Sequence, residues 1–220
     1  MRLLDVAQGS FEWRRARLGV PTASRAAEVV ARQKPAKGED VGKPAQVRKD
    51  YALQLAFERT TRMEWPVYVN AAMQRGTDLE PLARDEYEAR SGTMVEQVGM
   101  ALHDAFDVGA SPDGLVGADG LVEIKCPFEM TRVARVWATG DVSDYESQVQ
   151  WQLWVLARSW CDVVVYDPRL EDVGMHLFVK RIHADPATFD LFEREVPQFL
   201  DEVAALEAQL TAEKEKQQSE

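Results

Sequence analysis

The sequence predicts a single α/β domain in which helices flank one central mixed β-sheet. Three observations lead to this prediction. The chain has 220 residues, enough for one substantial hydrophobic core. Apolar residues recur at helical spacing in some segments, and in others they alternate with polar residues or form short runs. The helical segments lie both before and after the strand-like segments, as expected for a sheet covered by helices.

The predicted elements are separated by capping and turn signals. The first helix follows Pro21 and begins near Thr22 or Ser24, both good N-caps. The segment 33–45 is rich in Pro, Gly and charge and has no periodicity, which predicts a loop. Helices are predicted at 22–31, 47–60, 77–91 and 144–160 and from residue 186 to the polar C-terminus, and strands at 94–102, 107–111, 120–126, 161–167 and 174–182.

The periodicity also predicts which side chains of the helices are buried. Helix 77–91 is expected to start at Thr77 or Asp78, so that Pro81 falls in the first turn, where proline is tolerated. The predicted buried residues are Leu82, Ala83 and Tyr87 in this helix, Tyr51, Ala52, Leu53 and Leu55 in 47–60, and Val149, Leu153, Leu156 and Trp160 in 144–160.

Short turns connect the first three strands. His103-Asp104, Pro112-Asp113-Gly114 and Gly117-Ala118-Asp119-Gly120 are turn sequences. We therefore expect these strands to form an antiparallel meander. The predicted domain covers residues 1–206, and residues 207–220 form a polar C-terminal tail with the character of a frayed helix.

Composition excludes several classes of protein. The chain is 45% hydrophobic and 29% charged, as in an ordinary water-soluble domain. It contains no apolar run of the roughly 20 residues that a membrane-spanning helix needs, and residues 1–13 lack the apolar region typical of a signal peptide. Two cysteines are too few for a disulfide framework, and the three histidines have no zinc-binding spacing. We therefore expect a cytoplasmic protein with no membrane partner.

The net charge of −11 conceals an asymmetry along the chain. Residues 1–62 contain 13 Lys and Arg against 7 Asp and Glu, whereas the remaining residues contain 13 basic and 30 acidic side chains. Local charge, rather than total charge, attracts a polyanion. The balance is therefore compatible with DNA as a partner, but it does not by itself indicate one.

The stretch 111–127 places charges in an apparently buried strand. Side chains two residues apart point to the same face of a strand, so Glu123 and Lys125 share one face, while Val122, Ile124 and Cys126 point into a core. The glycine-rich turns before this strand can fold Asp113 back beside Glu123. Two carboxylates and an ammonium would then meet at the edge of the sheet.

Such a cluster suits phosphodiester hydrolysis. Two neighbouring carboxylates repel each other unless a cation neutralises them, and Mg²⁺ prefers a site made of oxygen ligands. The ion can polarise a phosphoryl group and lower the pKa of water, and a neighbouring lysine can orient or deprotonate that water or offset transition-state charge. The alternative for Glu123 and Lys125 alone is a solvated surface pair between strands.

Pro112-Asp113 followed by Glu123-Ile124-Lys125 resembles the signature of the PD-(D/E)xK nuclease superfamily. The longer stretch 111–128 resembles lambda exonuclease and the related phage-type recombination exonucleases. Four further segments resemble this family in the same order, namely 13–24, 75–92, 147–155 and 166–181. The resemblance thus covers nearly the whole chain, and it implies a restriction-endonuclease-like core.

The resemblance implies roles for the residues of this cluster. Asp113 and Glu123 would be metal ligands, together with the backbone carbonyl of Ile124, and Lys125 would be the catalytic lysine. The implied cofactor is Mg²⁺, with two ions in the site and Mn²⁺ as a substitute.

Two further residues enter the expected active site only through the resemblance. Glu80 would be an additional acidic residue near the second metal or the attacking water, and Gln148 would shape the site from a neighbouring helix. The alternative for Glu80 is an interaction with a helix dipole, worth about 0.3–1 kcal/mol. The alternative for Gln148 is an ordinary polar position on a helix.

The resemblance also implies a site for the end of the DNA. Arg17 and Ser24 match positions that bind a 5′-phosphate, and an arginine fork with a hydroxyl near a helix N-terminus makes a plausible phosphate pocket. Met73 matches an apolar residue that wedges between terminal bases, and its alternative role is plain packing.

The function implied is a Mg²⁺-dependent exodeoxyribonuclease. It would digest the 5′ strand of linear double-stranded DNA to mononucleotides and leave a 3′ single strand. The implied partners are DNA, two further copies of the chain in a ring-shaped homotrimer, and a phage single-strand annealing protein. The alternatives are an endonuclease or resolvase of the same superfamily, or a non-catalytic protein that binds DNA ends.

Overall fold

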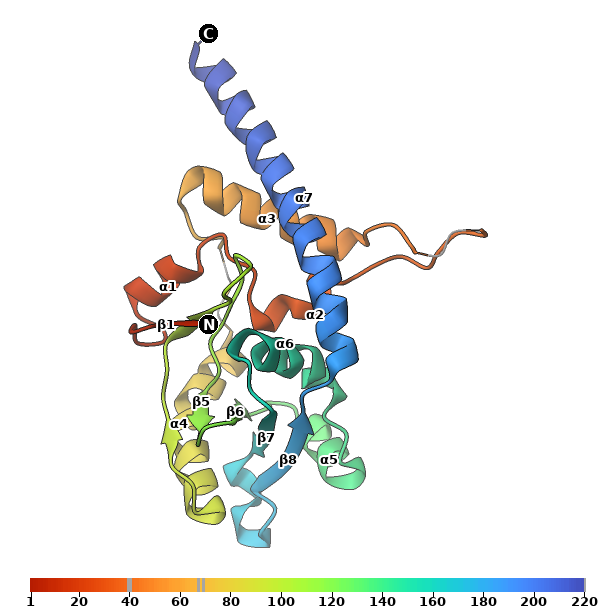
Figure 1. Cartoon of the computed structure of the whole chain (residues 1–220). Coiled ribbons are helices and arrows are strands. Elements are labelled where there is room, and N and C mark those ends of the chain that lie inside the picture. The colour runs from red at the N-terminus through yellow and green to blue at the C-terminus, as the bar shows by residue number, and fades with distance from the viewer. Residues whose placement is uncertain (39–40, 67, 69, 220) are drawn as a thin grey trace.

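A five-stranded mixed sheet forms the centre of the molecule in a computed structural model that describes residues 1–38, 41–66, 68 and 70–219 (Figure 1). The strand order is β2-β5-β6-β7-β8, and only the central pair β6·β7 is parallel. These strands span Val95–Glu96, Gly114–Val116, Gly120–Lys125, Trp160–Tyr166 and Leu177–His183. A smaller sheet has the order β1-β3-β4, with strands at Arg2–Leu4, Met100–Leu102 and Gly109–Ala110.

The two faces of the larger sheet are covered by different helices. Helix α4 (Ala71–Ser91) covers one face, where Val122 and Ile124 of β6 belong to the same buried cluster as Ala83 and Tyr87. Helix α6 (Glu146–Leu156) packs against the opposite face and belongs to a second, larger core. Leu121 of β6 lies in that second core. The expected alternation of side chains along β6 is therefore confirmed.

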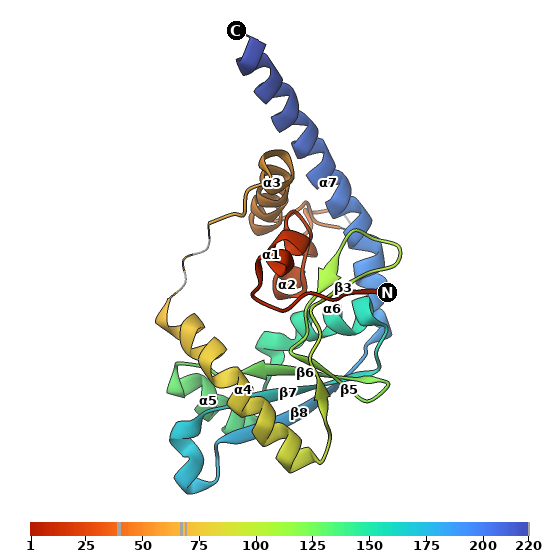
Figure 2. The ribbon, with the colours of Figure 1, turned by 90° about the vertical axis from the view of Figure 1, so that its left-hand side faces the viewer.

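Helices α3 (Gln46–Thr61) and α7 (Pro186–Ser219) pack together beyond α6 (Figures 1 and 2). The rings of Tyr51 of α3 and Phe199 of α7 pack together in a tilted arrangement, with their centroids 5.5 Å apart. The C-terminal end of α7 projects away from the rest of the molecule (Figure 1). The tail expected at 207–220 continues this helix through Ser219, and Glu220 lies outside the described residues.

The remaining helices are short. Helix α1 (Phe11–Arg17) is capped by Ser10, whose hydroxyl accepts a hydrogen bond from Trp13 N at 3.1 Å. The others are α2 (Ala26–Val29), α5 (Met130–Thr139) and the 3₁₀ helices η1 (Ala23–Arg25), η2 (Ser143–Tyr145) and η3 (Pro168–Val173).

The sequence located most elements and missed several short ones. Helix 47–60 is confirmed as α3, and the C-terminal helix as α7; strands 161–167 and 174–182 are confirmed as β7 and β8 with small shifts. Strands β1 and β5, helices α1 and α5 and the 3₁₀ helix η3 were not predicted. The helix expected at 22–31 is broken into η1 and α2. Thr22 does not cap it through its side chain, because its hydroxyl accepts from Arg17 at 3.2 Å.

The expected start of the helix at residue 77 is wrong. Helix α4 begins at Ala71 and is capped by Asn70, whose side chain accepts from Met73 N at 3.0 Å. Pro81 therefore lies inside the helix and not in its first turn. Leu82 is 51% exposed, and Leu53 of α3 is 44% exposed, so neither contributes to a core as predicted.

The predicted meander and the predicted end of helix 144–160 are also wrong. The segment 94–102 forms two strands in different sheets, and β4 joins the smaller sheet, so the turns connect two sheets instead of one. Helix α6 ends at Leu156, where Ala157 adopts a left-handed conformation, and Trp160 begins β7. Helix α6 is buried on almost every side, and periodicity could not mark where it ends.

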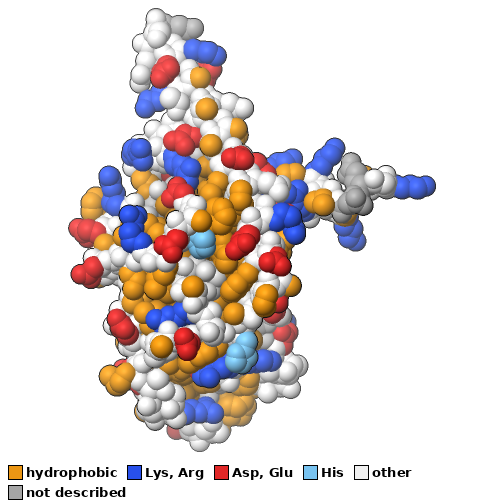
Figure 3. Space-filling model, viewed as in Figure 1, with side chains coloured by type: hydrophobic (Ala, Val, Ile, Leu, Met, Phe, Trp, Pro, Cys, Tyr) orange, Lys and Arg blue, Asp and Glu red, His pale blue; other side chains and the backbone are white. Residues whose placement is uncertain are grey.

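The predicted loop 33–45 projects between α2 and α3 (Figure 1), and its residues 39–40 lie outside the described part. Its ends are joined by a hydrogen bond from Gln33 N to Lys43 O at 2.8 Å. Lys and Arg side chains lie along it and over α1, whereas acidic side chains are scattered over this face (Figure 3). Within the described chain, no helix has the length and apolar character required to cross a membrane.

Candidate active site

Strand β6 positions the two charged residues that the sequence placed at the centre of the site. It lies between β5 and β7, so its backbone is hydrogen-bonded on both sides. The Glu123 side chain is 3% exposed, and Lys125 Nζ lies 2.6 Å from Glu123 Oε1. An ion pair buried in this way depends on further hydrogen bonds to its unused atoms.

Helix α6 supplies those hydrogen bonds. Gln148 and Gln152 are four residues apart and project from the same side of the helix. Gln148 Nε2 donates to Glu123 Oε1 at 2.5 Å, and Gln152 Nε2 donates to Glu123 Oε2 at 2.6 Å. Lys125 Nζ also donates to Gln148 Oε1 at 3.1 Å and lies 5.3 Å from the centre of the Tyr145 ring. The two glutamines thus hold Glu123 in one orientation.

Asp113 lies beside this strand, at the turn into β5. Its Oδ2 accepts a hydrogen bond from Ile124 N at 2.6 Å. Gln8 Nε2 donates to the carbonyl of Pro112 at 2.8 Å and so holds the turn from outside. The chain therefore places Asp113, Glu123 and Lys125 together.

Glu80 faces the same region from α4. It lines one pocket, of about 880 Å³, together with Asp113 and Trp13. Its carboxylate pairs with Arg84 one turn further along, at 2.5 Å. Because Glu80 lies in the interior of α4, the alternative role of interacting with the dipole of a helix N-terminus does not apply.

The carboxylates influence one another. Burial raises the pKa of Asp113 well above its ordinary value, and the charges of Glu123 and Glu80 raise it further. Burial and the charge of Glu123 also raise the pKa of Glu80, despite Arg84. Burial alone would lower the pKa of Lys125, but the charges of Glu123 and Asp113 outweigh it and raise that pKa. Three acidic groups therefore face Lys125 and Arg84, and Asp113 holds its proton more strongly than a solvated aspartic acid does.

The oxygen atoms of this cluster suit a hard divalent cation, although the acidic groups are not gathered at ligand distance. No three His, Cys, Asp or Glu side chains in 1–38, 41–66, 68 and 70–219 are grouped to hold a metal ion. Nevertheless, within those ranges no hydrogen-bond donor reaches Asp113 Oδ1 and only one reaches Glu123 Oε2. A carboxylate oxygen can accept twice, so both atoms have lone pairs to offer a cation.

A second pocket, of about 800 Å³, adjoins the first, and Trp13 lines both. Arg14, Arg17 and Arg25 line it with Ser24. Trp13 Nε1 donates to Ser111 Oγ at 3.0 Å, which ties α1 to the segment just before Asp113. The arginine pocket and the carboxylate cluster are thereby held next to each other.

Arg17 is the least neutralised of these arginines. Its guanidinium lies 4.3 Å from the centre of the Trp13 ring and donates to Thr22 Oγ1, and it forms no ion pair with any described carboxylate. Burial lowers the pKa of Arg17, although the charges of Tyr51 and Glu58 partly compensate. A half-buried cation with this few partners favours an anionic ligand.

The other two residues predicted for the DNA end lie in the same pocket. Ser24 is exposed in η1, and Met73 is 47% exposed in the first turn of α4. Both line the pocket with Arg17. Five of the predicted site residues therefore line two neighbouring pockets, with Arg17, Ser24 and Met73 in one and Glu80 and Asp113 in the other. The other four line neither pocket and are linked to Asp113 by hydrogen bonds and an ion pair, namely Glu123, Ile124, Lys125 and Gln148.

The sequence missed three residues that this site contains. Gln152 could have been found, because it is one helical turn beyond Gln148 on the same face. Trp13 and Trp65, which line the arginine pocket, had no such signal. Their positions depend on how α1 and the segment after α3 pack against distant parts of the chain.

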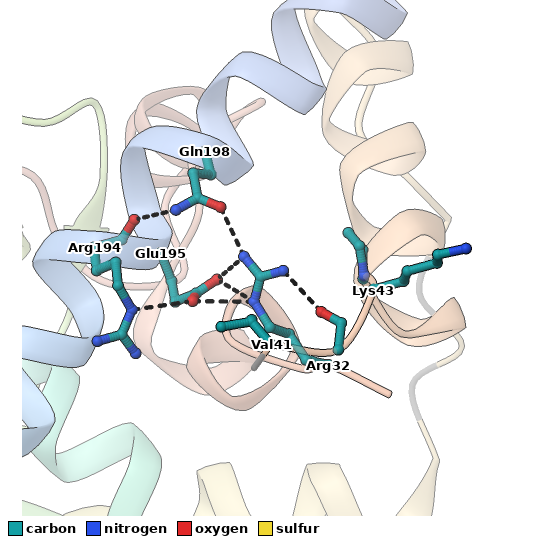
Figure 4. A pocket seen from close by; sticks show the side chains of 8 residues that line it. Arg32, Val41, Lys43, Arg194, Glu195 and Gln198 are labelled. Carbon is teal, nitrogen blue, oxygen red and sulfur yellow. Dashed lines mark hydrogen bonds and ion pairs between the residues drawn. The ribbon is translucent and has the colours of Figure 1, made fainter. Parts of the chain in front are cut away.

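A third pocket, of about 440 Å³, lies away from this site at the base of the projecting loop (Figure 4). Glu195 of α7 accepts hydrogen bonds there from Arg32 at 2.9 Å and from Arg48 at 2.7 Å. Arg32 also donates to Gln198 and to the carbonyl of Gly42. The charged and polar groups of this pocket hydrogen-bond to one another. We therefore interpret it as a place where the loop and α7 are held together, and not as a ligand site.

Comparison with known proteins agrees with this geometry. Residues 12–159 match the model of the YqaJ-like viral recombinase domain, and the chain therefore belongs to that family. No curated protein matches the chain. The resemblance to phage-type recombination exonucleases inferred from the sequence is thus confirmed.

Two solved structures are similar to most of the chain. The alkaline exonuclease LHK-Exo from Laribacter hongkongensis is 40% identical, with 94% of this chain and 99% of that chain covered and a TM-score of 0.80. The same enzyme in complex with dAMP gives a TM-score of 0.81. A phage related exonuclease from Haemophilus somnus 129PT is 14% identical, with coverage of 89% and 96% and a TM-score of 0.67, and shows the fold alone. The chain is therefore a homologue of an exonuclease, and the predicted fold class is confirmed.

Proposed function

We propose that this protein is a Mg²⁺-dependent exodeoxyribonuclease that digests the 5′ strand of linear double-stranded DNA to mononucleotides. The observation that carries this proposal is that two neighbouring pockets share Trp13 as a lining residue. One is a carboxylate–lysine cluster suited to phosphodiester hydrolysis, and the other is an arginine pocket suited to a terminal phosphate. The 40% identity to an alkaline exonuclease that also forms a complex with dAMP, a mononucleotide, supports the proposal.

The cluster would act by positioning charge. Asp113, Glu123 and the carbonyl of Ile124 would hold Mg²⁺, with Glu80 near a second ion. A divalent cation supplies polarisation of the phosphoryl group and a lower pKa for water. Lys125 would orient the attacking water and offset charge on the scissile phosphate.

The glutamines would serve as positioning residues. Gln148 and Gln152 hold the two oxygens of Glu123, so that the carboxylate does not have to reorient during the reaction. Arg17 and Ser24 would bind the 5′-phosphate, and Met73 would wedge against the terminal bases.

The partners expected from the resemblance belong to the same proposal. A ring-shaped homotrimer around the duplex would make digestion processive, and a single-strand annealing protein would coat the 3′ strand for recombination. Both would operate in the cytoplasm of a bacterial or phage-infected cell.

Digestion of a linear duplex labelled at either the 5′ or the 3′ end tests the reaction. With Mg²⁺ we expect the 5′ label to appear at once as a mononucleotide, while the 3′ label stays on a long strand. A chelator should abolish the release of the 5′ label, and added Mn²⁺ should restore it. Cleavage of covalently closed circular DNA would instead indicate an endonuclease, and early release of the 3′ label would reverse the proposed polarity.

Replacing Arg17 with alanine should remove the preference for a 5′-phosphate. A hydrogen bond to a charged group contributes about 1.5–3 kcal/mol, so kcat/KM on 5′-phosphorylated ends should fall about tenfold or more. The rate on 5′-hydroxyl ends should change little. Arg15→Ala is the matched control, because Arg15 lies on the same helix and does not line the pocket. An unchanged ratio of the two rates in Arg17→Ala would exclude Arg17 as the phosphate site.

A further inference from the structure

An exposed tryptophan forms part of the wall of the arginine pocket. Trp65 is 43% exposed, and it lines the pocket together with Arg17, Ser24 and Met73. Several other large apolar side chains of the described residues are also exposed, so exposure alone does not distinguish Trp65. Its position does, because the half-exposed indole shares a pocket with an arginine that forms no ion pair with a described carboxylate.

The backbone of Trp65 is held in place. Its N–H donates to Glu58 Oε1 at 3.1 Å. Glu58 is only 7% exposed and also accepts from Gly19 N at 2.9 Å and from Gln54 Nε2 at 3.2 Å. One buried carboxylate thus joins the segment after α3 to the loop after α1, and these are two walls of the same pocket.

The indole ring is also supported from behind. Phe57 contacts it edge to face, with centroids 5.7 Å apart and the planes at 90°. This arrangement restricts the ring and leaves the rest of it exposed at the pocket. A flat aromatic surface that is already oriented can stack on a base with little loss of conformational entropy.

We propose that Trp65 stacks on the base of the 5′-terminal nucleotide while Arg17 holds its phosphate. A base and its own phosphate are joined by a single sugar, so they can occupy two walls of one pocket. Stacking on an aromatic side chain tolerates every base, which suits an enzyme that must digest any sequence. The proposal rests on the proposed function, because it assigns a further residue to the same DNA end.

The direct test combines Trp65→Ala with a substrate that lacks the terminal base. The affinity for a 5′-phosphorylated duplex is measured in chelator, so that no cleavage occurs. We expect Trp65→Ala to weaken binding about tenfold, and Trp65→Phe to retain most of the affinity. An abasic 5′-terminal nucleotide should weaken DNA binding by the wild type by a similar factor. It should hardly change DNA binding by Trp65→Ala.

Salt dependence separates stacking from phosphate binding. Stacking releases no counterions, so Trp65→Ala should leave the slope of log affinity against log salt unchanged. A 2-aminopurine base at the 5′ terminus should be quenched on binding to the wild type and much less on binding to Trp65→Ala. Phe11→Ala is the control, since Phe11 is an exposed aromatic residue that does not line the pocket.

The outcomes distinguish this inference from the proposed function. Suppose that the wild type releases the 5′ label, but that removing the terminal base lowers the DNA affinity of Trp65→Ala as much as that of the wild type. Stacking is then excluded, and the proposed function stands. If Trp65→Ala changes the oligomeric state at unaltered DNA affinity, the indole contacts another protein copy and the inference is wrong. If the wild type neither binds nor digests duplex ends, the proposed function itself fails.

Discussion

Lys125→Ala is expected to lower the rate of phosphodiester hydrolysis by about 100-fold or more while leaving DNA binding nearly unchanged. Loss of one group that stabilises developing charge typically costs 10²–10³ in kcat. Lys125 lies 2.6 Å from Glu123 and does not line the arginine pocket, so the 5′-phosphate site should remain intact. Single-turnover digestion of a labelled duplex measures the rate, and binding in chelator measures the affinity.

Lys180→Ala provides the matched control. Lys180 lies on β8 of the same sheet, two strands from β6, and its ammonium donates to the carbonyl of Gly140 at 2.7 Å and pairs with none of the described carboxylates of the cluster. Its replacement should leave the rate unaltered. Equal rates for Lys125→Ala, Lys180→Ala and the wild type would remove Lys125 from the proposed chemistry.

Glu195→Ala is expected to destabilise the fold by about 3–5 kcal/mol, because it breaks a buried ion pair. Glu195 is 2% exposed, and Arg48, which pairs with it, is completely buried (Figure 4 shows its contact with Arg32). In this variant Arg48 would keep its ion pair with Glu202 but lose the one with Glu195, which is the more buried of the two carboxylates. For a chain of this length, the melting temperature should fall by about 10 °C.

Glu213→Ala is the control on the same helix. Glu213 pairs with Lys216, and both side chains are more than half exposed, so this replacement should change stability by less than about 0.5 kcal/mol. Thermal unfolding followed by circular dichroism compares the variants. A melting temperature for Glu195→Ala equal to that of Glu213→Ala would contradict the structural role of the network.

Acid should weaken the same network. Burial alone would raise the pKa of Glu195, but hydrogen bonds from Arg32 and Arg48 outweigh it and lower that pKa below its ordinary value of 4.5. The ionised form is therefore favoured in the folded state. Its contribution to stability is present above about pH 4.5 and is lost as the pH falls through the folded-state pKa. Glu195→Gln should lose this part of the pH dependence.

Local patterns predicted the parts of the structure that depend on one segment alone. The alternation of β6 located Glu123 and Lys125 on one face and Val122 and Ile124 on the other, because strand geometry fixes the direction of successive side chains. The helices α3 and α7 were predicted because each has a long apolar stripe. The missed helices α1 and α5 are short, and α1 buries no residue completely.

Errors arose where another local signal was overlooked and where distant segments pair with each other. Thr77 and Pro81 resemble a helix start, yet α4 begins at Ala71, because Asn70 caps it and the proline lies within the helix. The short strands around residue 100 looked like one meander. They divide between two sheets, because β3 pairs with β1, almost a hundred residues earlier in the chain.

The sequence by itself determined the family and the order of most elements, and it predicted a chemistry for the Asp113–Glu123–Lys125 cluster that the proposed function uses. Only the tertiary structure decided that Glu80 faces this cluster from the middle of a helix. It alone also showed that Gln152, together with Gln148, orients the carboxylate of Glu123. It also decided that Trp65 and Arg17 line one pocket. Periodicity reports which side of a segment is buried, whereas a pocket is formed by the packing of segments that are far apart in the chain.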